Sequence, residues 1–275
     1  MPPDLFRIKV NRHRFQLTCN MSLDKLVDCW RGEEEQLFSG WDFSYLDGRM
    51  FEEQAPWSYS SRAAELMRRC SSVVDLGTGG SERFLDLQEF WPEVVVATEE
   101  HAPNLKLATE RLVPFGAKVV DVRLTDRDPV PFSDCEFDLV LNRHSAFNPN
   151  EVARILSLGG TFLTQQIHGL WACDLLAAFD VKPQWPGSTL ERYVAQLRTT
   201  GLTILSAEEW SGRLAFADVG TLVYYLKAVP WLVPGFSVET HLKHLLGLQH
   251  RLESGEKLAF TARKFLIEAQ KKGPT

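Results

Sequence analysis

The sequence predicts a doubly wound α/β protein, with a mostly parallel seven-stranded sheet and helical cover segments towards both ends of the chain. Short β-branched runs alternate with helical segments across residues 71–209, which is the pattern of a parallel sheet covered on both faces. One apolar run, at 72–76, leads directly into a glycine-rich turn. The segments between the runs are long enough for βαβ crossovers, so the strands can wind in one sheet.

Six strands and three helices are expected within this central stretch. The strands are expected at 72–76, 94–98, 118–123, 137–142, 161–166 and 202–207, and the helices at 102–112, 151–156 and 188–200. The last helix has Ser188 and Glu191 at capping-box spacing, and Gly201 ends it. We therefore assign 71–209 to the core of the domain.

The flanking stretches lack this rhythm. Residues 1–70 are rich in aromatic and turn residues, which predicts an accessory or lid segment, and 6–10 alternate like a half-buried strand. Residues 210–275 predict a helical cap with helices at 218–231 and 237–252, followed by a closing strand at 258–267. The expected organisation is thus 1–70, 71–209 and 210–275.

Composition excludes several classes of protein. The chain has 275 residues, a formal net charge of −6 and 44% apolar residues, which is an ordinary globular composition. A net negative charge argues against a phosphate backbone as the main partner. The longest apolar stretch, 222–236, is interrupted by charge and proline and is shorter than the ~20 residues that cross a bilayer, so no membrane insertion is expected. Five scattered cysteines and a charged N-terminal segment predict a cytoplasmic protein with reduced thiols.

The glycine-rich turn carries the sharpest local signal. Asp75 stands two positions before Gly77, and Gly79 and Gly80 follow, so backbone can approach a ligand closely. A carboxylate at this position repels a pyrophosphate and suits an amino-bearing ligand, which argues against a nicotinamide-dependent dehydrogenase. Glu99 ends the next strand, where an acid can accept both hydroxyls of a ribose.

Further motifs follow in a fixed order. An E/D-x-G-x-G-x-G pattern matches 75–81 with Ser81 at the last glycine, a D-x-x-x-L-P-F pattern matches 126–132 with Val130 for Leu, an F-D-x-V pattern matches 137–140, and an E-x-x-R-V-L-x-P-G-G pattern matches 151–160 with Leu158 for Pro. Together with Glu99 the set resembles the class I S-adenosylmethionine-dependent methyltransferases, whose fold is Rossmann-like. The small-molecule branch is the most similar in style.

The resemblance implies a role for each matching residue. Asp75 would meet the methionine amino group of S-adenosyl-L-methionine, and the cofactor would lie along Gly77, Thr78 and Gly79. The ribose would bind to Glu99. The adenine would bind to Asp126 and the backbone of Arg127, and Asn142 and His144 would face the sulfonium and the acceptor.

The chemistry needs few obligatory side chains, because the methyl group is already activated and the protein chiefly aligns an in-line displacement. His144 is either a general base or a residue that only hydrogen-bonds its loop. Aromatic residues are candidates to line an acceptor cavity. They are Tyr45, Trp57, Tyr59, Trp171, Tyr224, Tyr225, Trp231 and Phe236.

Other functions remain open at this point. The tetrapeptide at 142–145 is not the D/N-P-P-Y/F motif of amino-directed methyltransferases, which makes an RNA or protein acceptor a weaker alternative than a small molecule. A catalytically silent binding module of the same fold is the other alternative. His241 and His244 have helical spacing but lack further ligands at suitable spacing, so no metal is expected. The sequence gives no basis for an oligomeric state or for a particular acceptor atom.

Overall fold

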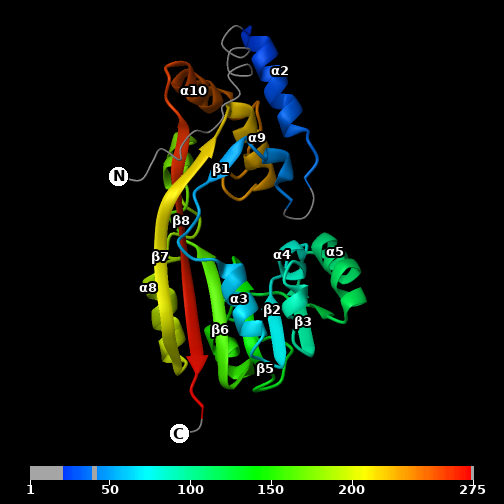
Figure 1. Ribbon diagram of the computed structural model, residues 1–275. Coiled ribbons are helices and arrows are strands. Elements are labelled where there is room, and N and C mark those ends of the chain that lie inside the picture. The colour runs from blue at the N-terminus through cyan, green and yellow to red at the C-terminus, as the bar shows by residue number, and fades with distance from the viewer. Residues whose placement is uncertain (1–20, 39–41, 274–275) are drawn as a thin grey trace, which may run out of the picture. The chain divides into compact units, whose positions relative to one another are not determined.

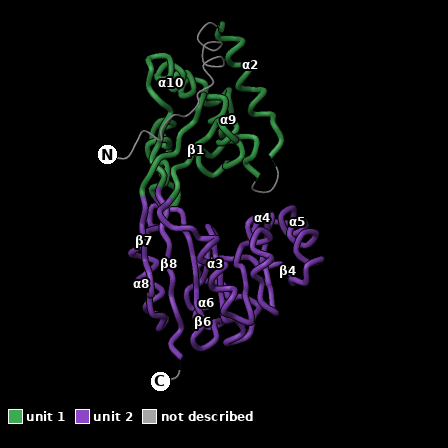
Figure 2. Tube along the Cα trace, viewed as in Figure 1, with its two compact units in different colours: residues 1–54, 170–185, 211–262 green, residues 55–169, 186–210, 263–275 purple. Residues whose placement is uncertain are grey.

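The computed structural model describes residues 21–38 and 42–273 and divides into two compact units (Figure 2). Unit 1 comprises residues 1–54, 170–185 and 211–262, and unit 2 comprises 55–169, 186–210 and 263–275. The strands β7 (Leu202–Phe216) and β8 (Leu258–Lys271) contribute residues to both units. The predicted organisation into 1–70, 71–209 and 210–275 stays a prediction. The predicted strand at 6–10 lies outside the described residues.

Unit 2 contains the predicted α/β core (Figure 1). Its other elements are α3 (Tyr59–Met67), β2 (Ser72–Leu76), α4 (Glu82–Leu85), η2 (Gln88–Phe90), β3 (Val94–Glu99), α5 (Ala102–Leu112), η3 (Val113–Phe115), β4 (Lys118–Asp121), β5 (Phe137–Arg143), α6 (Pro149–Ile155), β6 (Leu156–Ile167) and α8 (Leu190–Thr199). The expected alternation of strands and helices is therefore present.

Unit 1 holds the remaining described elements. They are α2 (Leu23–Glu34), η1 (Ser44–Leu46), β1 (Met50–Glu52), α7 (Cys173–Ala178), α9 (Val219–Ala228) and α10 (Leu242–Glu253). Among the described residues, no helix is both long and apolar enough to cross a membrane.

Within the described residues the sheet has eight strands in the order β1-β7-β8-β6-β5-β2-β3-β4, so the prediction of seven strands is corrected by one. The added strand is β1, three residues that pair antiparallel with the far end of β7 at 214–216. A three-residue strand is too short for its alternation to be recognised in the sequence. The pairs β2–β3, β2–β5, β3–β4 and β5–β6 are parallel, and β6–β8 is antiparallel, which confirms a mostly parallel sheet.

The helix α8 begins one residue later than the capping-box spacing implies. Its N-cap is Thr189, whose side chain accepts a hydrogen bond from the backbone N–H of Arg192. Ser188 instead donates its hydroxyl to the carbonyl of Ile167 at 3.0 Å. The serine thus ties the loop before α8 to β6.

Both faces of the sheet in unit 2 are covered by helices, as a parallel sheet requires. On one face α3 and α5 pack Ala63, Met67 and Ala108 against Leu141 and Leu163. On the other face α6 and α8 form a second core, which includes Val152, Leu197, Val140 and Phe162. The side chains that follow these apolar rows towards the carboxyl ends of the strands form the site described next.

Candidate functional site

The glycine turn after β2 lies directly against the segment that follows β5. Gly77 and Gly79 have φ of +78° and +62°, conformations that favour glycine. A Cβ on Gly77 would lie 2.5 Å from both Cβ and Oγ of Ser145, which leaves no room for a side chain. The backbone N–H of Gly77 donates to the hydroxyl of Thr98 on β3 at 3.0 Å. The turn is therefore shaped by contacts with β3 and with the segment that follows β5.

Ser81, at the last position of the glycine motif, adopts a backbone conformation that favours glycine. Its φ is +69°, in the left-handed region, and the residue is fully buried. Helix α5 holds the same turn through Arg111, whose Nη1 donates to the Gly80 carbonyl at 2.6 Å and to Glu82 Oε1 at 2.5 Å. The turn thus has a defined conformation despite the departure from glycine.

Asp75 is partly buried where β2 enters the turn. Loss of solvent raises the pKa of its carboxyl to about 6, and the nearby carboxylate of Glu99 adds to the rise, whereas Thr78 and the guanidinium of Arg143 oppose it. A carboxylate with a raised pKa gains most from a cationic partner, because such a partner replaces the lost solvation.

Three buried hydroxyl oxygens occur in this part of the chain without a hydrogen-bond partner among the described residues. They belong to Tyr59, Thr78 and Ser81. Burial also raises the pKa of Tyr59 well above its usual value, and the charge of Asp75 acts in the same direction, so the phenol is neutral. Buried polar atoms are normally paired, and unpaired ones at a turn of this kind are a mark of a ligand-binding site.

Glu99 is buried, with 8% of its surface exposed, and its carboxylate accepts three backbone hydrogen bonds. Oε2 accepts from Gly79 N at 2.8 Å, and Oε1 accepts from Glu100 N at 3.0 Å and from His101 N at 2.8 Å. A carboxylate has about four acceptor positions. One of them remains for a further donor, and the predicted binding of both ribose hydroxyls stays a prediction.

The loop after β4 reaches the glycine turn through Leu124, whose Cδ1 would lie 3.4 Å from a Cβ on Gly77. Asp126 and Arg127 follow two and three residues later. Their side chains are 55% and 88% exposed, and a weak ion pair of 3.7 Å joins them. The Arg127 carbonyl accepts from Asn148 Nδ2 at 2.9 Å, which fixes the loop backbone. Their adenine-binding role stays a prediction.

Asn142 is fully buried on the face of the sheet opposite Asp75, and its amide is committed to the protein. Nδ2 donates to the Leu76 carbonyl at 3.0 Å, and Oδ1 accepts from Thr164 Oγ1 at 3.0 Å and from Gln166 Nε2 at 2.5 Å. This network joins the ends of β2, β5 and β6. The geometry favours a structural role, and the predicted contact of Asn142 with the sulfonium stays untested.

His144 follows β5 with φ +64°. A chain of two hydrogen bonds, from Trp57 to Gln165 and from Gln165 to His144, determines which ring nitrogen carries the proton. The indole N–H of Trp57, which can only donate, donates to Gln165 Oε1 at 2.8 Å. The amide nitrogen of Gln165 therefore faces His144 Nε2, 3.0 Å away, and donates to it. Nε2 is an acceptor, so the proton of the neutral ring is on Nδ1.

The charges around His144 favour the same state. Desolvation, the guanidinium of Arg143 and the ammonium of Lys264 lower the pKa of His144 well below its usual value. The residue as a whole is exposed, and the two cations act on its ring. The hydrogen bond from Gln165 independently requires the neutral ring. A lowered pKa weakens the ring as a base, and the predicted catalytic role of His144 stays a prediction.

Sequence reasoning missed Gln165 and Lys264. Gln165 pairs with Arg143 in the register of β5 and β6, and Lys264 pairs with Ile167 in the register of β6 and β8. Both lie in strands whose apolar patterning was recognised. The strand order needed to bring them beside His144 is set by long-range pairing, which the local pattern does not contain.

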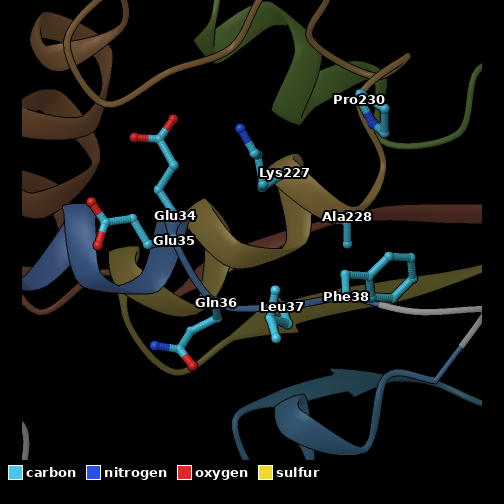
Figure 3. A pocket seen from close by; sticks show the side chains of 8 residues that line it. All are labelled: Glu34, Glu35, Gln36, Leu37, Phe38, Lys227, Ala228 and Pro230. Atoms are coloured by element: carbon cyan, nitrogen blue, oxygen red, sulfur yellow. The ribbon is translucent and has the colours of Figure 1, made fainter.

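The described residues of unit 1 carry a pocket of about 650 Å³ (Figure 3). It is lined by Glu34, Glu35, Gln36, Leu37, Phe38, Lys227, Ala228 and Pro230. None of these residues was predicted to take part in binding or catalysis. The chemistry expected from the glycine turn therefore belongs to unit 2.

Most of the predicted acceptor-lining aromatics also belong to unit 1. Only Trp57 and Tyr59 belong to unit 2. His241 and His244 lie in unit 1 with ring centroids 5.7 Å apart, and His244 Nε2 lies 3.2 Å from Asp180. Within the described part of the chain, no group of three suitable side chains could hold a metal ion.

Comparison with solved structures identifies the fold. A proposed methyltransferase from Bacillus halodurans aligns with a TM-score of 0.56 at 16% identity, over 78% of this chain and 97% of the other. The chain has the class I methyltransferase fold. The YcgJ protein of Bacillus subtilis aligns with a TM-score of 0.55 at 16% identity, over 78% of this chain and 99% of the other. No family model and no curated protein matches the sequence.

Proposed function

We propose that this protein binds S-adenosylmethionine at the carboxyl end of β2 and transfers its methyl group to a small-molecule acceptor. The observation that carries the proposal is the meeting of Asp75 with the buried hydroxyls of Tyr59 and Thr78 beside a glycine turn. These groups suit the amino and carboxyl groups of an amino acid. The methyltransferase fold of the chain is also consistent with binding of this cofactor.

When bound, S-adenosylmethionine supplies a methyl group that needs no further activation. The residues of this chain then bind and orient. Asp75 holds the amino group, the backbone of Gly77 and Gly79 lies against the ligand, and the remaining acceptor position of Glu99 receives one ribose hydroxyl. Alignment of this kind supplies several kcal/mol, roughly 7 to 11 in the best intramolecular cases.

Proton removal is not assigned to His144. Its Nε2 lone pair is occupied by Gln165 and its pKa is lowered, so the ring is a weak base at neutral pH. The acceptor atom therefore needs to be nucleophilic as it binds. We expect the turnover number to show no inflection from a histidine between pH 6 and about 8, which a pH–rate profile with saturating substrates measures.

The test of cofactor binding is thermal unfolding with S-adenosylmethionine, with S-adenosylhomocysteine and with a reduced nicotinamide dinucleotide. At a concentration of 100 times Kd, a ligand stabilises the protein by about 2.7 kcal/mol. We expect the first two compounds to raise the melting temperature and the dinucleotide to leave it unchanged. Asp75→Asn should abolish the increase, and Asp86→Asn, at an exposed carboxylate of the same unit, should retain it. An unchanged melting temperature at millimolar ligand would refute the proposal.

A catalytically silent binding module is the second candidate, and the commitment of Asn142 and His144 to protein hydrogen bonds favours it. Both candidates predict cofactor binding. Incubation with S-adenosylmethionine and a metabolite panel, followed by mass spectrometry, separates them. A product heavier by one methylene group establishes an enzyme, and an RNA or protein acceptor is tested by the same mass increment.

A further inference from the structure

Two nucleophilic side chains, those of Cys135 and Lys271, meet at the end of the sheet where the parallel strands begin. Cys135 lies in the loop before β5, and Lys271 is the last residue of β8. The ammonium of Lys271 donates a hydrogen bond to Cys135 Sγ at 3.4 Å. Both residues belong to unit 2, whereas the glycine turn follows the opposite, carboxyl end of β2. An inference from this contact is therefore independent of the proposed function.

The thiol of Cys135 is held in place by its backbone. Its φ is +56°, in the left-handed region that residues other than glycine rarely adopt, and its N–H donates to the Arg154 carbonyl at 2.9 Å. The guanidinium of Arg154 donates to Asp134 Oδ1 at 2.9 Å and to the Phe132 carbonyl at 2.7 Å. These bonds fix the residues that precede the cysteine, and Cys135 itself remains exposed to solvent.

The amine of Lys271 is fixed by carbonyl groups at the end of α6. Its Nζ donates to the Leu156 carbonyl at 2.8 Å and to the Arg154 carbonyl at 3.5 Å. An ammonium has three N–H groups, and the third one is directed at the sulfur of Cys135. Loss of that third proton leaves the nitrogen lone pair pointing at Cys135 Sγ.

The other described cysteines lack this arrangement. Burial raises the pKa of the Cys70 thiol to about 11, and the charge of Asp138 acts in the same direction, so this thiol stays protonated and unreactive. Cys29 is exposed on α2, and Cys173 is partly buried at the start of α7. Within the described part of the chain, Cys135 is the cysteine that is both exposed and in contact with a lysine amine.

We propose that Cys135 and Lys271 form a modification site, at which a hydroperoxide converts their contact into a covalent sulfur–nitrogen bond. The thiol first takes one oxygen atom from hydrogen peroxide and becomes a sulfenic acid, and the peroxide is reduced to water. The ammonium of Lys271 loses one proton to solvent, and the neutral amine attacks the sulfur. The S–N bond forms, the S–O bond breaks, and the hydroxyl leaves as water with a second proton from the amine.

The reaction oxidises the sulfur by two electrons and is reversible. Two equivalents of a thiol reductant return the thiol and the amine and form their own disulfide. The flexible four-carbon stem of a lysine allows the short further approach of nitrogen to sulfur. The bond joins the end of β8 to the loop before β5, positions that are 136 residues apart in the sequence. It thereby fixes the last residue of the sheet's longest-range strand connection in unit 2 to the α/β core.

The test is mild oxidation of the reduced full chain with hydrogen peroxide, followed by alkylation, proteolysis and mass spectrometry. We expect a peptide that contains Cys135 to be joined to a peptide that contains Lys271, with a mass two hydrogen atoms below the sum of the two. Dithiothreitol should release both peptides. Cys135→Ser and Lys271→Arg should abolish the linked pair. Lys272→Arg, at the neighbouring exposed lysine, is the matched control and should retain it.

The variant Lys271→Arg separates the amine from the fold, because it keeps a cation and hydrogen-bond donors but removes the nucleophilic amine. In the reduced state it should melt at the temperature of the natural protein, and Lys271→Gln decides in the same way if the arginine variant does not fold. Oxidation of Cys135 without a link to Lys271 overturns the inference. A thiol of Cys135 that survives the peroxide, or a linked pair that persists in Lys271→Arg, also overturns it.

Discussion

At the scale of single residues, buried hydroxyls without a partner lower the stability of the ligand-free protein and leave polar atoms for a ligand. An unsatisfied buried polar group costs about 1–3 kcal/mol. Tyr59→Phe removes one such group, so we expect the ligand-free protein to be as stable as before or up to about 1 kcal/mol more stable, while the Kd of S-adenosylmethionine rises several-fold. Chemical denaturation and calorimetry measure the two effects. Tyr193→Phe, on α8, is the control and should change neither.

Asp75 predicts a specific dependence on pH. Its pKa in the folded protein, about 6, lies above the ordinary value of 3.8, so the folded state favours the protonated carboxyl. The ligand-free protein should therefore lose about 2–3 kcal/mol of stability as pH rises from about 4 to about 6, and little above that. Affinity for a cationic amino group should rise about tenfold from pH 5 to pH 7, because the carboxyl loses its proton over that range.

The variant Asp75→Asn separates this effect from general acid denaturation. It should be more stable than the natural protein at pH 7.5, and its weak cofactor affinity should not change with pH. Urea unfolding and calorimetric titration at pH 5, 6 and 7 measure both. An affinity of the natural protein that falls as pH rises would show that Asp75 does not hold the amino group.

The steric role of Gly77 can be separated from its backbone role. Gly77→Ala places a Cβ 2.5 Å from Ser145, whereas Gly116→Ala, also at positive φ, meets no atom within 4 Å. Both variants pay about 1–2 kcal/mol for the left-handed conformation. We expect Gly77→Ala to lose more than Gly116→Ala in urea unfolding and to bind the cofactor more weakly. Adding Ser145→Gly to Gly77→Ala should recover the stability that Gly77→Ala loses beyond Gly116→Ala. Equal losses of stability in the two single variants would contradict a steric role for Gly77.

At the scale of elements, α3 is tied to β8 by Arg62 and the buried carboxylate of Glu268. Arg62→Gln leaves that carboxylate without its cation, and removal of one partner of a buried pair costs about 3–5 kcal/mol. Because the Arg62 side chain is 34% exposed, we expect a smaller loss, about 2 kcal/mol, in urea unfolding. Glu65→Gln, which removes the exposed partner of the same arginine, should cost less than about 0.5 kcal/mol. Equal effects would contradict the importance of the buried pair.

Elements were predictable from sequence wherever their signal is local. The strand at 72–76 and the helix at 102–112 have the predicted bounds, because β-branched runs and apolar periodicity determine them. The strands β6 and β7 run past their predicted ends, since the glycines at 159–160 and the polar residues after 207 depart from strand patterning and are held by neighbouring strands. The strand β1 depends on a partner more than 150 residues away.

The candidate site was predictable in part for the same reason. The positions of Asp75, the glycine turn and Glu99 follow from strand ends, which the sequence shows. The hydrogen bonds that Glu99 and Asn142 accept from the protein depend on three-dimensional contacts, as does the neutral state of His144. Residue type and spacing contain no information on whether a polar atom is already occupied.

At the scale of the whole molecule, the candidate cofactor site and the pocket belong to different compact units. Unit 2 contains the glycine turn, the buried hydroxyls of Tyr59, Thr78 and Ser81, and the contact of Lys271 with Cys135. Unit 1 contains the pocket lined by Glu34 and Lys227 (Figure 3). We therefore expect the cofactor to bind to unit 2.

Hydrogen exchange with and without S-adenosylhomocysteine tests this claim most directly, because it reports both whether the ligand binds and where. Amides that a ligand immobilises exchange more slowly. We predict slower exchange in peptides that cover 72–82, 98–101 and 142–145, and unchanged exchange in peptides that cover 34–38 and 227–230. Protection confined to the second pair of segments, or no protection in either, would contradict the assignment of the methyl-donor site.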